Sequence, residues 1–144
     1  MKRFRQGVNS VSDSKHKPIW VQFIPHDLQA YNTVGDYCED EDFIRFLISD
    51  TGNPIYNNAI VIHEFVEYAR NNQLGISCEL VTKFDLAHPE LEDPGLSPLA
   101  PYHSTHMEGD SLERLFIILS GADWIEYEAA LKTLTDSYQT KENS

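Results

Sequence analysis

The stretch from residue 59 to residue 69, Ala-Ile-Val-Ile-His-Glu-Phe-Val-Glu-Tyr-Ala, constrains this chain more than any other. It contains no glycine or proline and is apolar on most sides, which favours a buried α-helix. Three ionisable residues, His63, Glu64 and Glu67, nevertheless lie in its middle. Because an unpaired carboxylate is costly where solvent is scarce, the fold has to provide partners for them.

The spacing of these three residues suits a metal site. His63 and Glu67 are one helical turn apart and share a face, while Glu64 is rotated by about 100° from His63. An imidazole and a carboxylate so placed can both reach one cation, and a neighbouring glutamate can act as a base on water. This is the H-E-x-x-H arrangement with glutamate in place of the second histidine. A helix edge on which His63 and Glu67 merely pair, or a buried hydrogen-bonded network, explains the same spacing.

The charge of the chain narrows the classes of partner. The 144 residues include 23 acidic and 11 basic side chains, for a net charge of -12. This balance argues against nucleic acid as a direct ligand and suits cation binding or docking on a basic protein. Two cysteines are too few for a disulfide framework, and no apolar run approaches the ~18 residues that span a bilayer. We therefore expect a cytoplasmic protein with no membrane partner.

The distribution of apolar residues predicts a single α+β domain over residues 18–138. Residues 1–17 are basic and polar and predict a flexible leader, and residues 139–144 predict a disordered tail. Residues 19–24 and 43–48 are β-branched and aromatic and predict a short antiparallel β element. The predicted helices, on which this β element packs, cover residues 54–72, 76–86, 102–121 and the residues after 123.

Local signals define the ends and the buried face of the first helix. Asn53 is suited to cap it, Pro54 to occupy its first turn and Gly75 to close the turn after it. Residues 26–37, by contrast, show no clear period. Along the helix, apolar residues recur at steps of four and three and predict the stripe that faces the core: Ile55, Ala59, Ile62, Val66 and Ala69.

Three further residues are candidate ligands beside His63 and Glu67. His103 and His106 are three residues apart at the start of the third predicted helix, and either could supply a further imidazole, or both could be surface histidines. Asp85 is an alternative oxygen ligand, or a partner that orients an imidazole, or an aspartate at a helix end that faces water. His26 follows the first strand and is either a turn residue or part of the same cleft.

Several short motifs together resemble a family of small uncharacterised phage proteins, over roughly residues 19 to 128. The residues that carry the resemblance are Phe23-Ile24-Pro25-His26, Gln29-x-Tyr31-x-Thr33-x-Gly35-Asp36, Ser49-Asp50-x-Gly52, His63-Glu64-x-x-Glu67, Phe84-Asp85, Ala100-Pro101-Tyr102, His106 and Glu113-Arg114. The resemblance implies that His63, Glu64, Glu67, Asp85 and His106 belong together, with His103 second. It also implies an infected bacterial cell as the location.

The order of a strand followed by an H-E-x-x helix is also similar to the minimal core of zinc-dependent peptidases, the zincins. The chain departs from them at Glu67, where those enzymes have histidine. The resulting expectation is a zincin-like metal-dependent hydrolase in which His63, Glu67 and His106 hold a divalent ion, Asp85 lies nearby and Glu64 is the general base. Zinc is the preferred ion, although two histidines and a carboxylate also suit Fe²⁺ or Mn²⁺.

The alternative comes from a different class: a non-catalytic acidic phage protein that binds and inhibits a host factor. In that case the net charge of -12 provides the docking surface, and any metal is structural.

Overall fold

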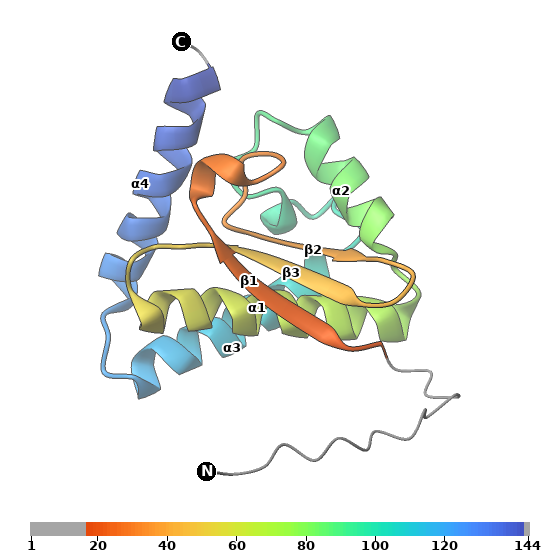
Figure 1. The fold of residues 1–144 in the computed structure, drawn as a ribbon, viewed down its shortest axis with the longest axis horizontal. Helices are drawn as coiled ribbons and strands as arrows, with labels where there is room; N and C mark the ends of the chain where they lie inside the picture. Colours follow the sequence, from red (N-terminus) through yellow and green to blue (C-terminus); the bar gives the residue numbers. More distant parts are fainter. Residues whose placement is uncertain (1–16, 143–144) are drawn as a thin grey trace, which may run out of the picture.

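The computed structural model describes residues 17–142, so residues 1–16 of the predicted leader lie outside the described part. The architecture is α+β, and the described chain forms four α-helices and a small mixed sheet of three strands (Figure 1). The strands are β1 (Ile19–Ile24), β2 (Gly35–Glu39) and β3 (Ile44–Ser49). The α-helices are α1 (Pro54–Leu74), α2 (Cys78–Ala87), α3 (His103–Leu119) and α4 (Trp124–Glu142), with two 3-10 helices, η1 (His26–Leu28) and η2 (Pro94–Leu96). Helix α4 continues past residue 138, where the sequence predicts that the domain ends.

The sheet has the order β1-β3-β2, with β3 in the centre. β2 pairs antiparallel with β3, whereas β1 pairs parallel with β3, with Ile19 opposite Ile44. The prediction that residues 19–24 and 43–48 are antiparallel is therefore wrong. The sequence pattern predicts no strand in residues 26–37, yet β2 begins at Gly35, and this additional reversal of the chain makes β3 run in the same direction as β1.

Helix α1 begins and ends as its local sequence predicts. The side chain of Asn53 accepts hydrogen bonds from the backbone amides of Ile55 and Tyr56, and Pro54 occupies the first turn. Gly75 ends the helix in the left-handed conformation, with φ of 73°, which a residue with a Cβ adopts only with strain.

The predicted core stripe of α1 is only partly right. Ala59 is buried, but Ile55, Ile62, Val66 and Ala69 are only half-buried. Instead, the buried positions in the middle and second half of the helix are mostly polar: Ile60, His63, Glu64, Glu67 and Asn71. Because α1 lies between the sheet and α3 (Figure 1), its polar face is the one that is enclosed.

The apolar core lies between the sheet and α1 and extends to one residue each of α3 and α4. Its buried members are Tyr37, Ile44, Phe46, Ile48, Ala59, Ile60, Ile117 and Tyr127. These residues hold β2 and β3 against α1, and so fix the positions from which the polar side chains of α1 project. The phenol groups of Tyr37 and Tyr127 point out of this core into the polar cluster described below.

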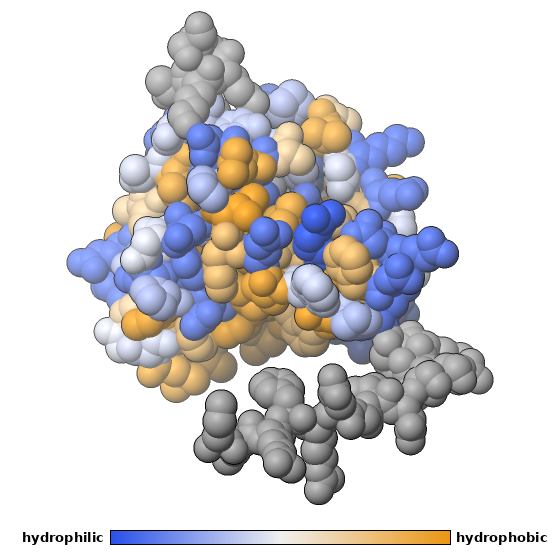
Figure 2. Space-filling view, viewed as in Figure 1, coloured by the Kyte–Doolittle hydropathy of each residue, from blue (hydrophilic) through white to orange (hydrophobic). Residues whose placement is uncertain are grey.

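The outer strand β1 leaves apolar side chains in contact with solvent. Ile19, Trp20, Val21 and Phe23 are 42–63% exposed, and Figure 2 shows apolar side chains across the middle of the face where β1 runs. None of the described helices is both long and apolar enough to cross a membrane.

Candidate metal centre

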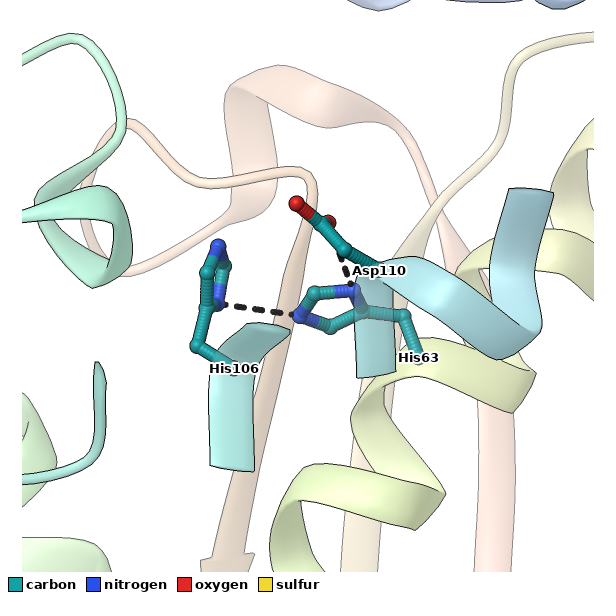
Figure 3. Close-up of side chains that lie close together, drawn as sticks. All are labelled: His63, His106 and Asp110. Carbon is teal, nitrogen blue, oxygen red and sulfur yellow. Dashed lines mark hydrogen bonds and ion pairs between the residues drawn. The ribbon is translucent and has the colours of Figure 1, made fainter. Parts of the chain in front are cut away.

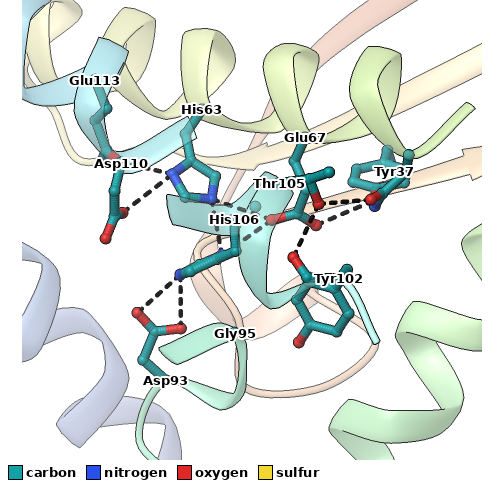
Figure 4. A network of polar contacts seen from close by, with 12 residues as sticks. Tyr37, His63, Glu67, Asp93, Gly95, Tyr102, Thr105, His106, Asp110 and Glu113 are labelled. Atoms are coloured by element: carbon teal, nitrogen blue, oxygen red, sulfur yellow. Dashed lines mark hydrogen bonds and ion pairs between the residues drawn. The ribbon is translucent and has the colours of Figure 1, made fainter. Parts of the chain in front are cut away.

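Helices α1 and α3 pack closely and provide the central side chains of the site (Figure 4). His63 and Glu67 come from α1, and His106 comes from the second turn of α3. Gly109 permits the close approach of the helices, since a Cβ there would lie 3.1 Å from the backbone oxygen of His63 and 3.2 Å from its ring. Gly95 of η2 packs against the ring of His106 in the same way, since a Cβ at Gly95 would lie 2.4 Å from that ring.

Three potential ligand atoms converge at this point. Nε2 of His63 lies 3.1 Å from Nδ1 of His106 and 3.3 Å from Oε2 of Glu67, and Nδ1 of His106 lies 2.9 Å from the same oxygen. Atoms that bind a tetrahedral ion at 2.0–2.2 Å lie roughly 3.3–3.6 Å from one another. The triangle formed by His63, Glu67 and His106 therefore needs to widen by only a few tenths of an ångström to hold a metal ion.

Carboxylates fix the orientation of both imidazole rings. Nδ1 of His63 lies 2.8 Å from Oε2 of Glu113, and Nε2 of His106 lies 3.2 Å from Asp93. Because an ionised carboxylate only accepts hydrogen bonds, these outer nitrogens carry the ring protons. In the neutral form of each ring, the nitrogens that face Glu67 would then carry the lone pairs, as they do in metal-ligating histidines.

The carboxylates themselves are held by tyrosines. Tyr37 donates to Oε1 of Glu67 at 3.0 Å, and Asn71 donates to the Tyr37 oxygen at 2.9 Å. Tyr127 donates to the second oxygen of Glu113. Each potential ligand thus has a partner on its far side, which fixes the geometry before any ion binds.

The hydrogen bonds also set the protonation of the cluster in the absence of an ion. Burial lowers the pKa of His106, but the hydrogen bonds to Asp93 and Glu67 outweigh burial and raise it to about 10. Burial likewise opposes a charge on His63, yet contacts with Asp110 and Glu113 hold its pKa well above the usual value. Burial raises the pKa of Glu67, but hydrogen bonds from the two histidines lower it to about 2. Protons therefore occupy the position that a cation would take.

Asp110 is a further potential ligand from α3, one turn after His106. Its carboxylate and the ring nitrogens of His63 and His106 offer atoms that all lie within 4.8 Å of one another (Figure 3). In this conformation it lies 3.3 Å from Nδ1 of His63, on the side of the ring that Glu113 also contacts. Asp110 thus orients the ring of His63, whereas Glu67 contacts the facing nitrogens of both rings.

The structure brings together three of the five site residues named from the sequence, namely His63, Glu67 and His106. Asp85 lies outside this triangle, because its carboxylate accepts hydrogen bonds from Tyr31, at 3.0 Å, and from Tyr102. His103 is directed elsewhere as well, with Nδ1 at 2.8 Å from the backbone oxygen of Gly95.

His26 does not line the site. It is buried beside β3, with Nδ1 at 2.8 Å from Oγ of Ser49.

Glu64 lies on the neighbouring side of α1. Its side chain is buried, and among the described residues neither of its carboxylate oxygens has a hydrogen-bond partner. The carboxylate touches Gly35 of β2, where a Cβ would lie 2.5 Å from Oε1. Burial and the charge of Glu67 hold the pKa of Glu64 well above its usual range.

A cavity of about 690 Å³ connects Glu64 with the triangle. His63, Glu64, Glu67 and His106 all line it, as do Asp85 and residues of β2, η2 and α4. The polar groups of the site are therefore accessible to a small ligand from one common space.

Sequence reasoning misses the carboxylates that orient the rings, Asp93, Asp110 and Glu113. For two of them the signal is present, because His106, Asp110 and Glu113 are spaced i, i+4 and i+7 on α3 and so share a face. Asp93 lies in the proline-rich loop before η2, and no spacing rule connects it with His106.

A class of site follows from this geometry: a two-histidine, one-carboxylate cluster with a buried glutamate beside it. Comparison of the chain with protein-family models, curated proteins and solved structures finds no match. The geometry of the site therefore carries the functional argument.

Proposed function

We propose that this protein is a metal-dependent hydrolase with a zincin-like centre. His63, Glu67 and His106 would hold the ion, with zinc preferred and Fe²⁺ or Mn²⁺ also suited to two nitrogens and an oxygen. Three protein ligands leave one coordination position for water or substrate, as catalytic zinc sites do. When bound, such an ion polarises a carbonyl group and acidifies water.

The convergence of three lone-pair donors carries this proposal. Two ring nitrogens and a carboxylate oxygen face one another at 2.9–3.3 Å, while the far side of each group is occupied by a hydrogen-bond partner. In a purely structural network, protons on the ring nitrogens would satisfy Glu67 but would leave two charged rings facing each other at 3.1 Å. Only a cation or added protons satisfy all three at once.

Glu64 supplies the base in the proposed mechanism. Its carboxylate has no donor among the described residues and lines the same cavity as the ligand triangle. A water between Glu64 and the ion would give up a proton to the carboxylate and then attack the substrate carbonyl. The raised pKa of Glu64 suits this role, because it makes the carboxylate a stronger base towards water.

The strand β2 supports an extended chain as substrate. β2 is an edge strand, antiparallel to β1 and β3, and its residues Gly35, Asp36 and Tyr37 line the cavity. An extended peptide can pair with the backbone of an exposed edge strand. This favours a peptidase within the broader class of hydrolases.

Elemental analysis of the purified protein tests the metal centre. We expect one divalent ion per chain, lost in His106→Ala and retained in the matched control His103→Ala, which alters the same turn of α3. Metal should also raise the melting temperature of the wild type, because binding to the folded state alone stabilises it. Equal metal contents in the two variants would contradict the assignment of the ligands.

Mass spectrometry of a peptide mixture incubated with the loaded protein tests the reaction. Glu64→Gln should retain the ion but lose about 10²–10⁴-fold in cleavage rate, the contribution of a positioned base. Absence of any cleavage by the loaded wild type, with metal present, would contradict a peptidase.

One observation favours the alternative, a non-catalytic acidic protein that docks on a host factor. The edge strand β1 exposes Ile19, Trp20, Val21 and Phe23 together, and clustered exposed apolar residues are typical of interfaces. Under this alternative, Trp20→Ala abolishes binding and inhibition of the host factor, and Glu64→Gln leaves both intact. The hydrolase proposal expects the reverse.

A further inference from the structure

The cavity beside the ligand triangle is strongly acidic. Among the described residues, nine carboxylates and a single lysine, Lys132, line it. Lys132 is already paired with Glu92 and Asp136 at the surface. Apart from the two histidines of the triangle, the described residues therefore place no unpaired cation against the negative charge of the cavity.

The carboxylates of the cavity that are not exposed to solvent differ in their hydrogen-bond partners. Those around the triangle, including Glu67 and Glu113, receive hydrogen bonds from histidines or tyrosines. In contrast, Asp36 and Glu64 have no side-chain partner among the described residues, and Asp36 accepts only from the backbone amide of Tyr37. The excess charge is thus concentrated where β2 meets α1.

Glu64 indicates that this position receives a ligand. It is 9% exposed, and neither oxygen has a donor in the described chain. A carboxylate has about four acceptor sites, so a single water shared with a metal ion leaves most of them unused. A carboxylate buried in this way is stable in its ionised form only beside a positive or strongly donating partner.

Aromatic residues in the cavity favour an organic cation over a second metal ion. Tyr31, Tyr102 and Trp124 line the same cavity. Ammonium and guanidinium groups are attracted to aromatic rings as well as to carboxylates, and they are large enough to reach both. A second metal ion would instead need its ligands to come together around one point.

We propose that the cavity binds a positively charged substrate group, an ammonium or guanidinium, between Asp36 and Glu64. Its role as a substrate subsite rests on the proposed hydrolase function, whereas the binding of the cation does not. The class of substrate is then a basic peptide or amine, and phosphate esters and acidic peptides are excluded by repulsion.

Calorimetry with two neutral-backbone probes tests this inference. N-acetyl-arginine amide carries the cation, and N-acetyl-glutamine amide has a similar shape without it. We expect the arginine probe to bind chelator-treated protein at least about tenfold more tightly than the glutamine probe, the effect of one partly buried charge pair. Equal affinities for the two probes would overturn the proposal.

Two variants of equal charge locate the subsite. Asp36→Asn should lose about tenfold in affinity for the arginine probe, while Asp42→Asn, in the exposed turn after β2, should bind it as the wild type does. Circular dichroism verifies that both variants are folded. An equal loss in both variants would indicate a general effect of surface charge and contradict the subsite.

Probe binding without metal and peptide cleavage with metal can succeed or fail independently. Probe binding is measured without metal, so a protein that binds the arginine probe but cleaves no peptide fails only as a hydrolase. A protein that cleaves acidic and basic peptides equally well, and prefers neither probe, fails only in the cationic subsite.

Discussion

Two glutamates of α1 three residues apart, Glu67 and Glu64, have opposite surroundings although both are buried. Glu67 contacts the rings of His63 and His106 and accepts a hydrogen bond from Tyr37, and its pKa falls to about 2. Glu64 has no donor within residues 17–142, and burial raises its pKa. Burial alone therefore does not determine the state of a carboxylate; the donors around it do.

The surroundings of Glu67 and Glu64 differ in how many of their polar groups have hydrogen-bond partners. Around Glu67, both histidines have a carboxylate on the far side of the ring, and Tyr37 donates to Glu67. Around Glu64 and Asp36, the described residues provide no side-chain donor.

Replacing Glu67 should have the largest effect. Glu67→Ala leaves two histidines of raised pKa without their shared carboxylate, so we expect the free energy of unfolding of metal-free protein to fall by about 3–5 kcal/mol. Urea denaturation in the presence of a chelator measures it. Glu64→Gln is the control and should not destabilise the protein, because it removes an unpaired charge. Similar losses in both variants would remove the distinction between the two glutamates.

Alanine substitutions of Gly95 and Gly35 should differ in their effect on metal binding. In Gly95→Ala the new Cβ meets the rigid ring of His106, and displacement of the ring should cost about 1–3 kcal/mol and weaken metal binding. In Gly35→Ala the Cβ meets the flexible end of Glu64, so metal binding should persist while hydrolysis is lost. Competition with a chromophoric chelator and the peptide assay measure the two outcomes. Equal metal affinity in the two variants would show that Gly95 does not position His106.

Glu113 should affect metal binding without touching the ion. Glu113→Gln weakens the hydrogen bond that orients His63, and we expect metal affinity to fall about 10–100-fold. Glu108→Gln is the matched control on the same helix, because Glu108 pairs only with Arg70 at the surface. A change of affinity in the control as large as in Glu113→Gln would argue that net charge, and not orientation, is responsible.

Replacing Asp36 should have the smallest effect on the free energy of unfolding, and this effect should depend on pH. Burial raises its pKa from 3.8 to about 6 in the folded state. The folded state then holds a proton that the unfolded state has lost, so stability falls as the pH rises from about 4 to 6. Asp36→Asn removes this fall and should stabilise the protein at pH 7 by about 1–2 kcal/mol, less than the full shift because the side chain is partly accessible. An unchanged pH profile of the denaturation midpoint would contradict a raised pKa of Asp36 in the folded state.

Local sequence signals anticipated the parts of the fold that depend on near neighbours. The cap at Asn53, the terminus at Gly75 and the shared face of His63 and Glu67 follow from spacing within one helix. β2 was not anticipated, because among its residues only Tyr37 is a large apolar side chain, and its inner face also includes Gly35. Without β2, the relative direction of β1 and β3 could not be predicted. β2 is antiparallel to β3, so it reverses the chain once more between β1 and β3.

Spacing within α1 is sufficient to place an imidazole and a carboxylate on one face of the helix, because one helical turn fixes their separation. Tertiary structure decided that His106 and not His103 completes the triangle, that Asp85 is held by two tyrosines, and that Asp93 and Glu113 orient the rings. Apart from the contact of His103 with Gly95, these contacts join residues that are 13 to 54 positions apart in the chain. They depend on how closely α1, α3 and η2 approach one another at Gly95 and Gly109, a distance that packing sets and local spacing does not.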